Sequence, residues 1–403
     1  MQEKANKPAL RFKGFDEDWE QRKLGDMCSL ITKGTTPLDK SSVGTVNFVK
    51  IENIDESSGE IKITQKITTE EHNGYLRRSQ LNVNDILFSI AGTLGRVTSV
   101  KSDILPANTN QALAIIRLKS GCLQYIKTYL KGKAVADFIK KNPTIGAQPN
   151  LSLEQVGNLE IALPTKNEQE LIGAYFANLD NLITLHQRKY TKLVNIKKAM
   201  LEKMFPKNGE DVPEIRFAGF TDPWEQRKLG ELGSVSMNRR IFKEQTTATG
   251  DVPFYKIGTF GGIADAFISR NLFEEYKSKY PYPKIGDILI SASGSIGRTV
   301  EYTGKDEYFQ DSNIVWLNHD DRLDNTFLKA FYTIVKWSGI EGSTIKRLYN
   351  DNILNTEIEL PSVDEQQMIG KFFYKLDNLI TLHQRKLEKL QHIKKACLEK
   401  MFV

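Results

Sequence analysis

The chain of 403 residues is 40% hydrophobic and carries a net charge of +6, from 56 Lys and Arg against 50 Asp and Glu. This length and composition predict a globular protein of two or three domains, and the small positive excess suits a polyanionic partner such as DNA without requiring one. No apolar signal segment opens the chain, no stretch approaches the roughly 18 apolar residues of a membrane span, and three scattered cysteines predict neither a disulfide framework nor a zinc site, so we expect a cytoplasmic protein.

Two segments of the chain occur twice. Arg11–Met27 (RFKGFDEDWEQRKLGDM) recurs as Arg216–Leu232 (RFAGFTDPWEQRKLGEL), and Leu179–Phe205 recurs as Leu376–Phe402 with 22 of 27 aligned positions identical. Between these repeats the two halves agree only in short stretches. A scaffold that is kept twice around differing residues predicts two related modules that read two different things.

The regions that differ have a mixed α/β pattern with short strands. DILFSIAGTLGRV at Asp85–Val97 and DILISASGSIGRT at Asp287–Thr299 each predict a strand that leads into a glycine turn. A Gly-x-x-Gly turn followed by Arg96 or Arg298 could bind a phosphate through its backbone amides, and a plain strand-to-strand turn is the alternative.

Amide side chains follow these turns. They include Asn110 and Gln111 in the first half and Asn313 in the second. An amide is suited to bidentate pairing with an adenine edge, although Asn and Gln also cap turns. Both interpretations stay open at the level of the sequence.

Each of the later repeats predicts one long helix. An acidic start follows Pro164 in the first half and Pro361 in the second, and about 40 residues, or roughly 60 Å, are expected in each helix. Apolar residues recur at spacings of three and four, the pattern of a coiled-coil seam. The seam positions are Leu179, Ile183, His186, Leu193 and Ile196 in the first copy and Leu376, Ile380, His383, Leu387, Leu390 and Ile393 in the second.

An apolar stripe needs a partner, and the nearest partner for each helix is its own repeat. We therefore predict an α+β fold in which two globular mixed α/β domains are separated by two long helices that form an antiparallel coiled coil, with an internal pseudo-two-fold repeat. The seam histidines could be pH switches or ligands, but a polar residue that fixes the register of a coiled coil is the favoured interpretation.

Several catalytic motifs are missing from the sequence. It contains no G-x-x-x-x-G-K-[ST] loop, no G-x-G-x-x-G fingerprint and no Asn-Pro-Pro-Tyr or Asp-Pro-Pro-Tyr segment of the kind that amino-methyltransferases use. The five histidines form no pair with metal-ligand spacing. We predict no catalytic, cofactor-binding or metal residues in this chain.

These features together resemble the specificity subunit of type I restriction-modification systems. The resemblance rests on the tandem RF-x-GF-x-x-x-WEQRKLG starts, the D-I-L-x-S-x-x-G-[TS]-x-G-R turns and the two L-D-N-L-I-T-L-H-Q-R-K helices, and it spans essentially the whole chain. It implies two target-recognition domains, each reading one half of a split DNA sequence, with the helices as spacer. The division then expected is a first target-recognition domain (1–164), a first spacer helix (165–206), a linker (207–215), a second target-recognition domain (216–361) and a second spacer helix (362–403).

The resemblance also implies partners. Double-stranded DNA is the expected ligand, two adenine methyltransferase subunits are expected to dock on the helices, and restriction and translocase subunits complete the assembly. S-adenosylmethionine, ATP and magnesium are expected in those partner subunits, so this chain would itself be non-catalytic. Because the two variable regions differ, the target is expected to be asymmetric.

Residue type and position in the two halves indicate candidate contacts to DNA. Arg96 and Arg298 are the strongest candidates because they occupy the same place beyond matching glycine turns. The remaining candidates are Lys33, Asn110, Gln111 and Gln148 in the first half and Arg239, Arg240, Asn313, Lys346 and Arg347 in the second. Two alternatives remain: a divergent metal-dependent nuclease that dimerises through the helices, and a coiled-coil scaffold whose variable regions bind proteins.

Overall fold

The computed structural model divides into two compact units. Unit 1 consists of residues 1–189 and 383–403, and unit 2 consists of residues 190–382. The structure describes residues 7–39, 41, 43–55, 58–141, 150–207, 209–339 and 347–402. The boundary between the units falls inside the two long helices, so each unit contains one globular part and a portion of each helix.

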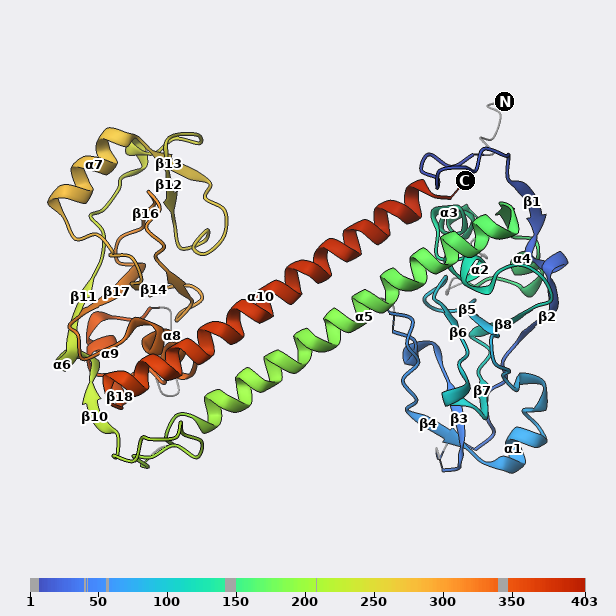
Figure 1. Ribbon diagram of the computed structural model, residues 1–403, viewed down its shortest axis with the longest axis horizontal. Coiled ribbons are helices and arrows are strands. Elements are labelled where there is room, and N and C mark those ends of the chain that lie inside the picture. The colour runs from blue at the N-terminus through green and yellow to red at the C-terminus, as the bar shows by residue number, and fades with distance from the viewer. Residues whose placement is uncertain are drawn as a thin grey trace. The chain divides into compact units, whose positions relative to one another are not determined.

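Unit 1 contains three small sheets (Figure 1). A four-stranded sheet has the order β2-β8-β5-β6, a three-stranded sheet has the order β4-β3-β7, and β1 pairs with β9. The pairs are antiparallel except for β3 and β7, which run parallel. The strands are β1 (Glu20–Lys23), β2 (Cys28–Lys33), β3 (Val46–Val49), β4 (Gln65–Ile67), β5 (Ile86–Ser89), β6 (Val97–Ser99), β7 (Ala107–Thr109), β8 (Leu113–Leu118) and β9 (Glu160–Leu163).

Unit 2 repeats this topology with different side chains. Its sheets have the orders β11-β17-β14-β15, β13-β12-β16 and β10-β18, and β12 and β16 form the parallel pair. The strands are β10 (Glu225–Lys228), β11 (Gly233–Ser236), β12 (Val252–Tyr255), β13 (Ala266–Ile268), β14 (Ile288–Ser291), β15 (Thr299–Glu301), β16 (Tyr308–Phe309), β17 (Ile314–His319) and β18 (Glu357–Leu360). The predicted mixed α/β character and internal repeat are thus confirmed.

Short helices complete both units. In unit 1 they are α1 (Thr69–Asn73), α2 (Leu123–Tyr129), α3 (Lys133–Lys141) and α4 (Leu153–Gly157), with 3-10 turns at Leu24–Met27, Ile51–Asn53, Arg77–Ser79 and Ser102–Ile104. In unit 2 they are α6 (Leu229–Leu232), α7 (Arg270–Lys279), α8 (Asn325–Ile334) and α9 (Asn350–Leu354), with a 3-10 turn at Lys243–Gln245. The segment that is helix α3 in unit 1 therefore has no helical counterpart among the described residues of unit 2.

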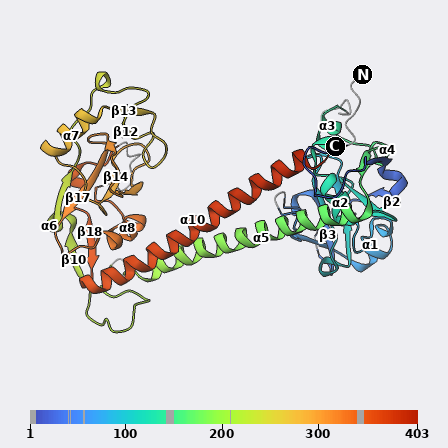
Figure 2. The same ribbon diagram turned by 45° about the horizontal axis from the view of Figure 1, so that its top comes forward.

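The two long helices are α5 (Lys166–Lys203) and α10 (Val363–Lys400), each of 38 residues. In each unit, half of one helix lies beside half of the other in the opposite direction (Figures 1 and 2). Equivalent ion pairs connect them: Asp180 Oδ1 lies 2.7 Å from Lys394 Nζ in unit 1, and Asp377 Oδ1 lies 2.6 Å from Lys197 Nζ in unit 2. These matched contacts confirm the antiparallel pairing and show why both helix copies keep the same Asp and Lys.

The histidines of the seam meet in unit 1. His186 Nδ1 and His383 Nδ1 are 2.8 Å apart, and both rings are half-buried. Burial lowers the pKa of His186, and the charges of His383, Lys386 and Lys189 lower it further. At this distance one ring must donate and the other accept a hydrogen bond, which requires at least one neutral imidazole.

The repeated RF-x-GF start has a structural reason. The Arg11 guanidinium makes two hydrogen bonds to the Glu168 carboxylate, at 2.7 and 2.8 Å, and Arg216 makes the same pair to Glu365. Each carboxylate is almost fully buried in the first turn of its long helix. The start of each half is thereby clamped to the helix that ends it, which explains why both segments are duplicated together.

Each unit has its own principal core, completed by the end of a long helix. In unit 1 the Phe402 ring packs against Trp19 and Tyr125, and in unit 2 the Phe205 ring packs against Trp224 and Phe327.

Among the described residues, no helix is both long and apolar enough to cross a membrane.

Candidate nucleic-acid interface

The two glycine turns share one hydrogen-bond pattern. Ser89 Oγ donates to the Thr93 carbonyl at 2.6 Å and accepts from the Arg96 backbone N–H at 2.7 Å. Ser291 makes the equivalent bonds to the Ser295 carbonyl and the Arg298 backbone N–H. The glycines of both turns have positive φ, from 65° to 83°, which a residue with a Cβ rarely adopts. A buried serine therefore holds each turn, and the strands that follow begin at Val97 and Thr299.

Both arginines beyond these turns donate to backbone carbonyls of their own unit. Arg96 Nη1 lies 3.3 Å from the carbonyl oxygens of Ile51 and Ile54, and Arg298 Nη1 lies 2.8 Å from that of Phe260. Each guanidinium thus joins its glycine turn to a neighbouring loop. The proposal that Arg96 and Arg298 contact DNA stays a prediction, and the structure gives them a second role in holding loops together.

In unit 1 four loops meet at one end of the four-stranded sheet. The end of β2 contacts the turn after β7, because Thr35 N donates to the Thr109 carbonyl at 2.8 Å and Thr36 Oγ1 hydrogen-bonds to Gln111 Oε1. The segment before α4 contacts the glycine turn, because Leu151 N donates to the Ile90 carbonyl at 2.8 Å. Gln111, predicted from the sequence as a DNA contact, therefore lies in this loop cluster.

The corresponding loops meet in unit 2, three of them through hydrogen bonds and the segment after β11 through Met237, which lies beside them. Leu348 N donates to the Ala292 carbonyl and Ala292 N to the Asn313 carbonyl, both at 2.7 Å. Asn313 Oδ1 accepts a hydrogen bond from Ser293 Oγ at 2.8 Å. Arg347 Nη2 donates to the Ser312 carbonyl at 3.2 Å. The structure thus brings together Asn313 and Arg347, which are 34 positions apart in the sequence.

Equivalent isolated β-bridges define matched positions in the two clusters. The isolated bridge between Ala91 and Asn150 in unit 1 corresponds to the bridge between Ser293 and Arg347 in unit 2. Asn150 and Arg347 therefore occupy equivalent positions in the two units but carry different hydrogen-bonding groups. Equivalent backbone bridges that carry different side chains are compatible with two readers of different sequences.

The other predicted contacts lie at the end of β2, after β7 and after β11, or outside the described residues. Lys33 is exposed at the end of β2, and Asn110 is half-buried in the turn after β7. Arg239 and Arg240 are exposed, with their guanidinium carbons 5.2 Å from the Tyr280 ring centre and 5.7 Å from that of Phe242. Gln148 and Lys346 lie outside the described residues.

Sequence reasoning missed two exposed or strained residues of the unit 2 cluster. Tyr349 is 64% exposed, and Ser312 has a φ of +51°, which is uncommon for a residue other than glycine. The available signal was the sequence Lys-Arg-Leu-Tyr, in which an aromatic residue lies two positions beyond Arg347.

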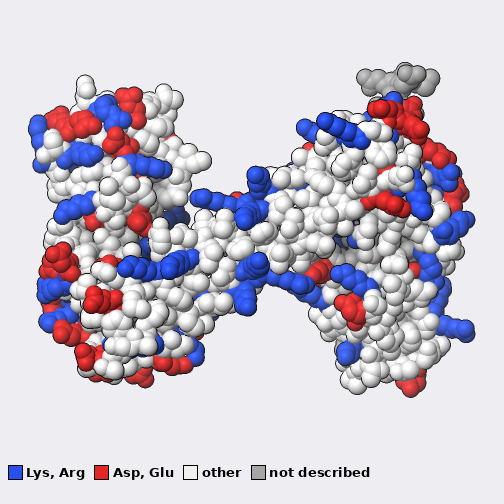
Figure 3. Space-filling model, in the orientation of Figure 1, with Lys and Arg blue, Asp and Glu red and all other residues white. Residues whose placement is uncertain are grey.

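Basic side chains also lie along the two long helices (Figure 3). Arg188, Lys189 and Lys192 of α5 are exposed, as are Arg385 and Lys386 of α10. Such residues suit a solvent-exposed helix face and also a polyanion, so their charge alone does not select a ligand.

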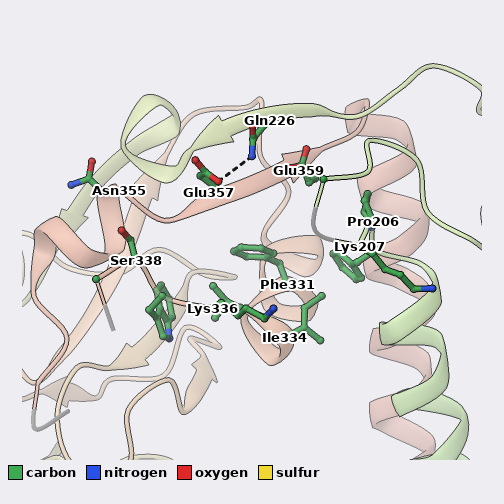
Figure 4. Close-up of a pocket in the computed structure, with 15 residues that line it drawn as sticks. Pro206, Lys207, Gln226, Phe331, Ile334, Lys336, Ser338, Asn355, Glu357 and Glu359 are labelled. Carbon is green, nitrogen blue, oxygen red and sulfur yellow. Dashed lines mark hydrogen bonds between the residues drawn. The ribbon is translucent and has the colours of Figure 1, made fainter. Parts of the chain in front are cut away.

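Unit 2 also contains a hollow of about 1130 Å³ (Figure 4). Phe331 and Ile334 of α8 lie opposite the carboxylates of Glu357 and Glu359, and Gln226 Nε2 donates to Glu357 Oε2 at 3.0 Å. Burial raises the pKa of Glu359, and the charge of Glu357 adds to that effect. In the part of the chain that the structure describes, no group of three or more His, Cys, Asp or Glu side chains could hold a metal ion.

Comparison with known proteins agrees with this geometry. The family model for the type I restriction modification DNA specificity domain matches residues 16–195 and 221–392, which are the two repeats. A putative type I restriction enzyme specificity subunit from Haemophilus influenzae is 56% identical over 153 residues, which cover 38% of this chain and 40% of that protein. The putative MjaX specificity subunit from Methanocaldococcus jannaschii is 25% identical over 94% of this chain and 91% of that protein.

A solved structure shares the fold. The S subunit of a type I restriction-modification system from M. genitalium has a TM-score of 0.68 at 15% identity, and the match covers 98% of this chain and 99% of that one. Because the family model matches well over half of the residues, the chain belongs to the type I restriction-modification DNA specificity family. It contains two target-recognition domains, one in each unit.

Proposed function

We propose that this chain is the DNA-reading subunit of a type I restriction-modification complex and that each unit reads one half of an asymmetric bipartite site. The observation that supports the proposal is the set of backbone hydrogen bonds that the two units share. Both units hold three loops together through equivalent backbone hydrogen bonds, yet the matched positions carry different side chains, such as Asn150 and Arg347. Two different readers on one duplicated scaffold would read a target with two unlike halves.

The chemistry is assigned to partner subunits. In this proposal the bound chain directs adenine methylation or cleavage of DNA, while S-adenosylmethionine, ATP and magnesium act in the methyltransferase and restriction subunits. The complex would work where the chromosome lies, in the cytoplasm. The isolated chain is therefore expected to leave DNA uncut in the presence of magnesium, whereas cleavage at a defined site would favour a nuclease.

Matched apolar residues on the long helices support docking of two methyltransferase subunits. Leu182 and Leu379 are 43% and 44% exposed, and Leu185 and Leu382 are both 45% exposed. Leucines kept in both repeats at equal exposure are what two copies of one partner would bury. Changing Leu182 and Leu379 to Asp should abolish copurification with the methyltransferase subunit, whereas Leu38→Asp, at a 71% exposed loop leucine, should not.

The experiment that tests the reading function is single-molecule methylome sequencing of DNA from cells that express this chain with its cognate methyltransferase subunit. We expect one adenine-methylated motif with two unlike halves and an unspecific spacer. Exchanging residues 233–360 for those of a relative should alter only one half. Purification of the methyltransferase complex without any new methylated motif would reject the proposal and favour a protein-binding scaffold.

A further inference from the structure

A small hollow in the unit 2 loop cluster has the chemistry of a base-reading site. Its volume is about 340 Å³, and its lining includes Met237, Ser312, Arg347 and Tyr349. The lining comes from three of the four loops that meet in this unit, and the hollow lies at the position where unit 1 carries Asn150. The inference that follows rests on the proposed function and assigns one residue of unit 2 to one base of its half-site.

Arg347 has hydrogen-bond donors to spare. A guanidinium has five N–H donors, and among the described residues Arg347 uses its side chain for one hydrogen bond, to the Ser312 carbonyl. Its side chain forms no ion pair with a described carboxylate, unlike Arg322, which lies 2.7 Å from Asp320. The residue is exposed, so a ligand can reach the remaining donors.

Two neighbours fix the position of this guanidinium. Its central carbon lies 5.9 Å from the ring centre of Tyr349, and that ring is largely exposed instead of packed in a core. The Tyr349 backbone is itself fixed, because its N–H donates to Asn352 Oδ1 at 3.0 Å at the start of α9. Ser312 presents its carbonyl from a backbone with φ of +51°, a conformation that costs energy for serine and is often found at functional sites.

We propose that Arg347 reads a guanine in the half-site recognised by unit 2, with Ser312 and Tyr349 as positioning residues. Guanine presents two acceptors, O6 and N7, at its major-groove edge, and an arginine fork pairs with both at once. A hydrogen bond to Ser312 at one nitrogen and the nearby Tyr349 ring restrain the guanidinium while other donors stay available.

The test uses the complex of the whole chain with its cognate methyltransferase subunit and a pool of duplexes in which each base of the methylated target is varied singly. Arg347→Ala and Arg347→Lys should both lose discrimination at one guanine of one half by on the order of 10- to 100-fold. Discrimination at the other bases of the same half should persist, which shows that unit 2 of each variant is folded, and discrimination in the other half should be unchanged. Lysine keeps the charge but cannot pair in the bidentate manner.

Two further variants separate positioning from contact. Tyr349→Phe keeps the ring and should retain guanine discrimination, whereas Tyr349→Ala should lose part of it. Asn150→Ala should alter the half-site of unit 1 alone, and Arg322→Ala, at an exposed and ion-paired arginine, should alter neither half.

Several results would overturn the assignment. Full guanine discrimination by Arg347→Lys, or equal weakening on every sequence by Arg347→Ala, would mean that the residue contacts a phosphate. An unchanged target for Arg347→Ala would remove it from recognition altogether, while the proposed function would stand. If the unmodified complex methylates no specific target, the proposed function itself fails.

Discussion

Unit 1 and unit 2 differ least at the contacts that join the long helices to each other and to the globular parts. They differ most in the exposed loops. The Arg11 to Glu168 clamp recurs as Arg216 to Glu365 with equal distances, and the ion pair of Asp180 recurs at Asp377. By contrast, matched loop positions carry Asn in one unit and Arg in the other. Buried contacts are costly to change because each partner depends on the other, whereas exposed loop residues can vary without loss of stability.

The largest expected effect comes from the aromatic residue at the end of each long helix. Phe205→Ala should lower the free energy of unfolding of unit 2 by about 4 kcal/mol, because this ring is buried against Trp224 and Phe327. Phe402→Ala should cost unit 1 somewhat less, about 3 kcal/mol, because Phe402 is only partly buried. Hydrogen exchange resolved by unit, combined with urea titration, measures both.

Phe242→Ala is the matched control for these variants, because its ring is 51% exposed. It should change the stability of unit 2 by no more than roughly 0.5 kcal/mol. Equal losses for Phe242 and Phe205 would contradict the assigned cores.

The next effect concerns the clamps at the two helix starts. Arg11→Ala and Arg216→Ala should each destabilise their own unit by about 3 kcal/mol, since each leaves a buried carboxylate without its partner. The same unfolding measurement applies. Arg22→Ala, which breaks an exposed pair with Glu20, should leave stability unchanged. If only one of the two variants destabilised its own unit, the two clamps would not be equivalent.

The ion pairs between the helices sharpen the comparison. Asp180 lies near two lysines, Lys394 and Lys131, and burial together with neighbouring lysines lowers the pKa of Lys131 to about 8. Asp180→Asn should therefore cost about 2 kcal/mol, since it removes the carboxylate that both amines contact, whereas Asp377→Asn, at a carboxylate that contacts one amine, should cost about 1 kcal/mol. Equal costs in thermal unfolding would show that Lys131 adds nothing to this cluster.

The smallest effect is a pH dependence at the histidine pair. Because the pKa of His186 is lowered in the folded chain, the unfolded chain binds the proton more readily, and stability falls as the pH drops below the ordinary histidine value of 6.5. The loss continues until the pH has passed the lowered value. His186→Gln should flatten this part of the pH profile, whereas His392→Gln, at an exposed histidine, should not. An unchanged profile for His186→Gln would contradict the assignment.

Sequence periodicity was sufficient for the parts of the fold that repeat. The long helices follow from apolar spacing, and their antiparallel pairing follows from the need to bury two equal stripes. The sequence could not reveal that the guanidinium of Arg96 faces backbone carbonyls, because that depends on a loop more than 40 positions away. Nor could it reveal the positive φ of Ser312, since serine carries no preference for that conformation.

The central claim is that the two units are independent readers on one frame. The most direct measurement is the methylome of cells in which residues 233–360 of the chain are replaced by a second copy of residues 28–163, with the cognate methyltransferase subunit present. These segments begin and end at matched strands, β11 with β2 and β18 with β9. We predict a methylated target in which both halves carry the sequence that the first domain reads. A target that keeps its original second half, or one in which both halves are new, would contradict the account.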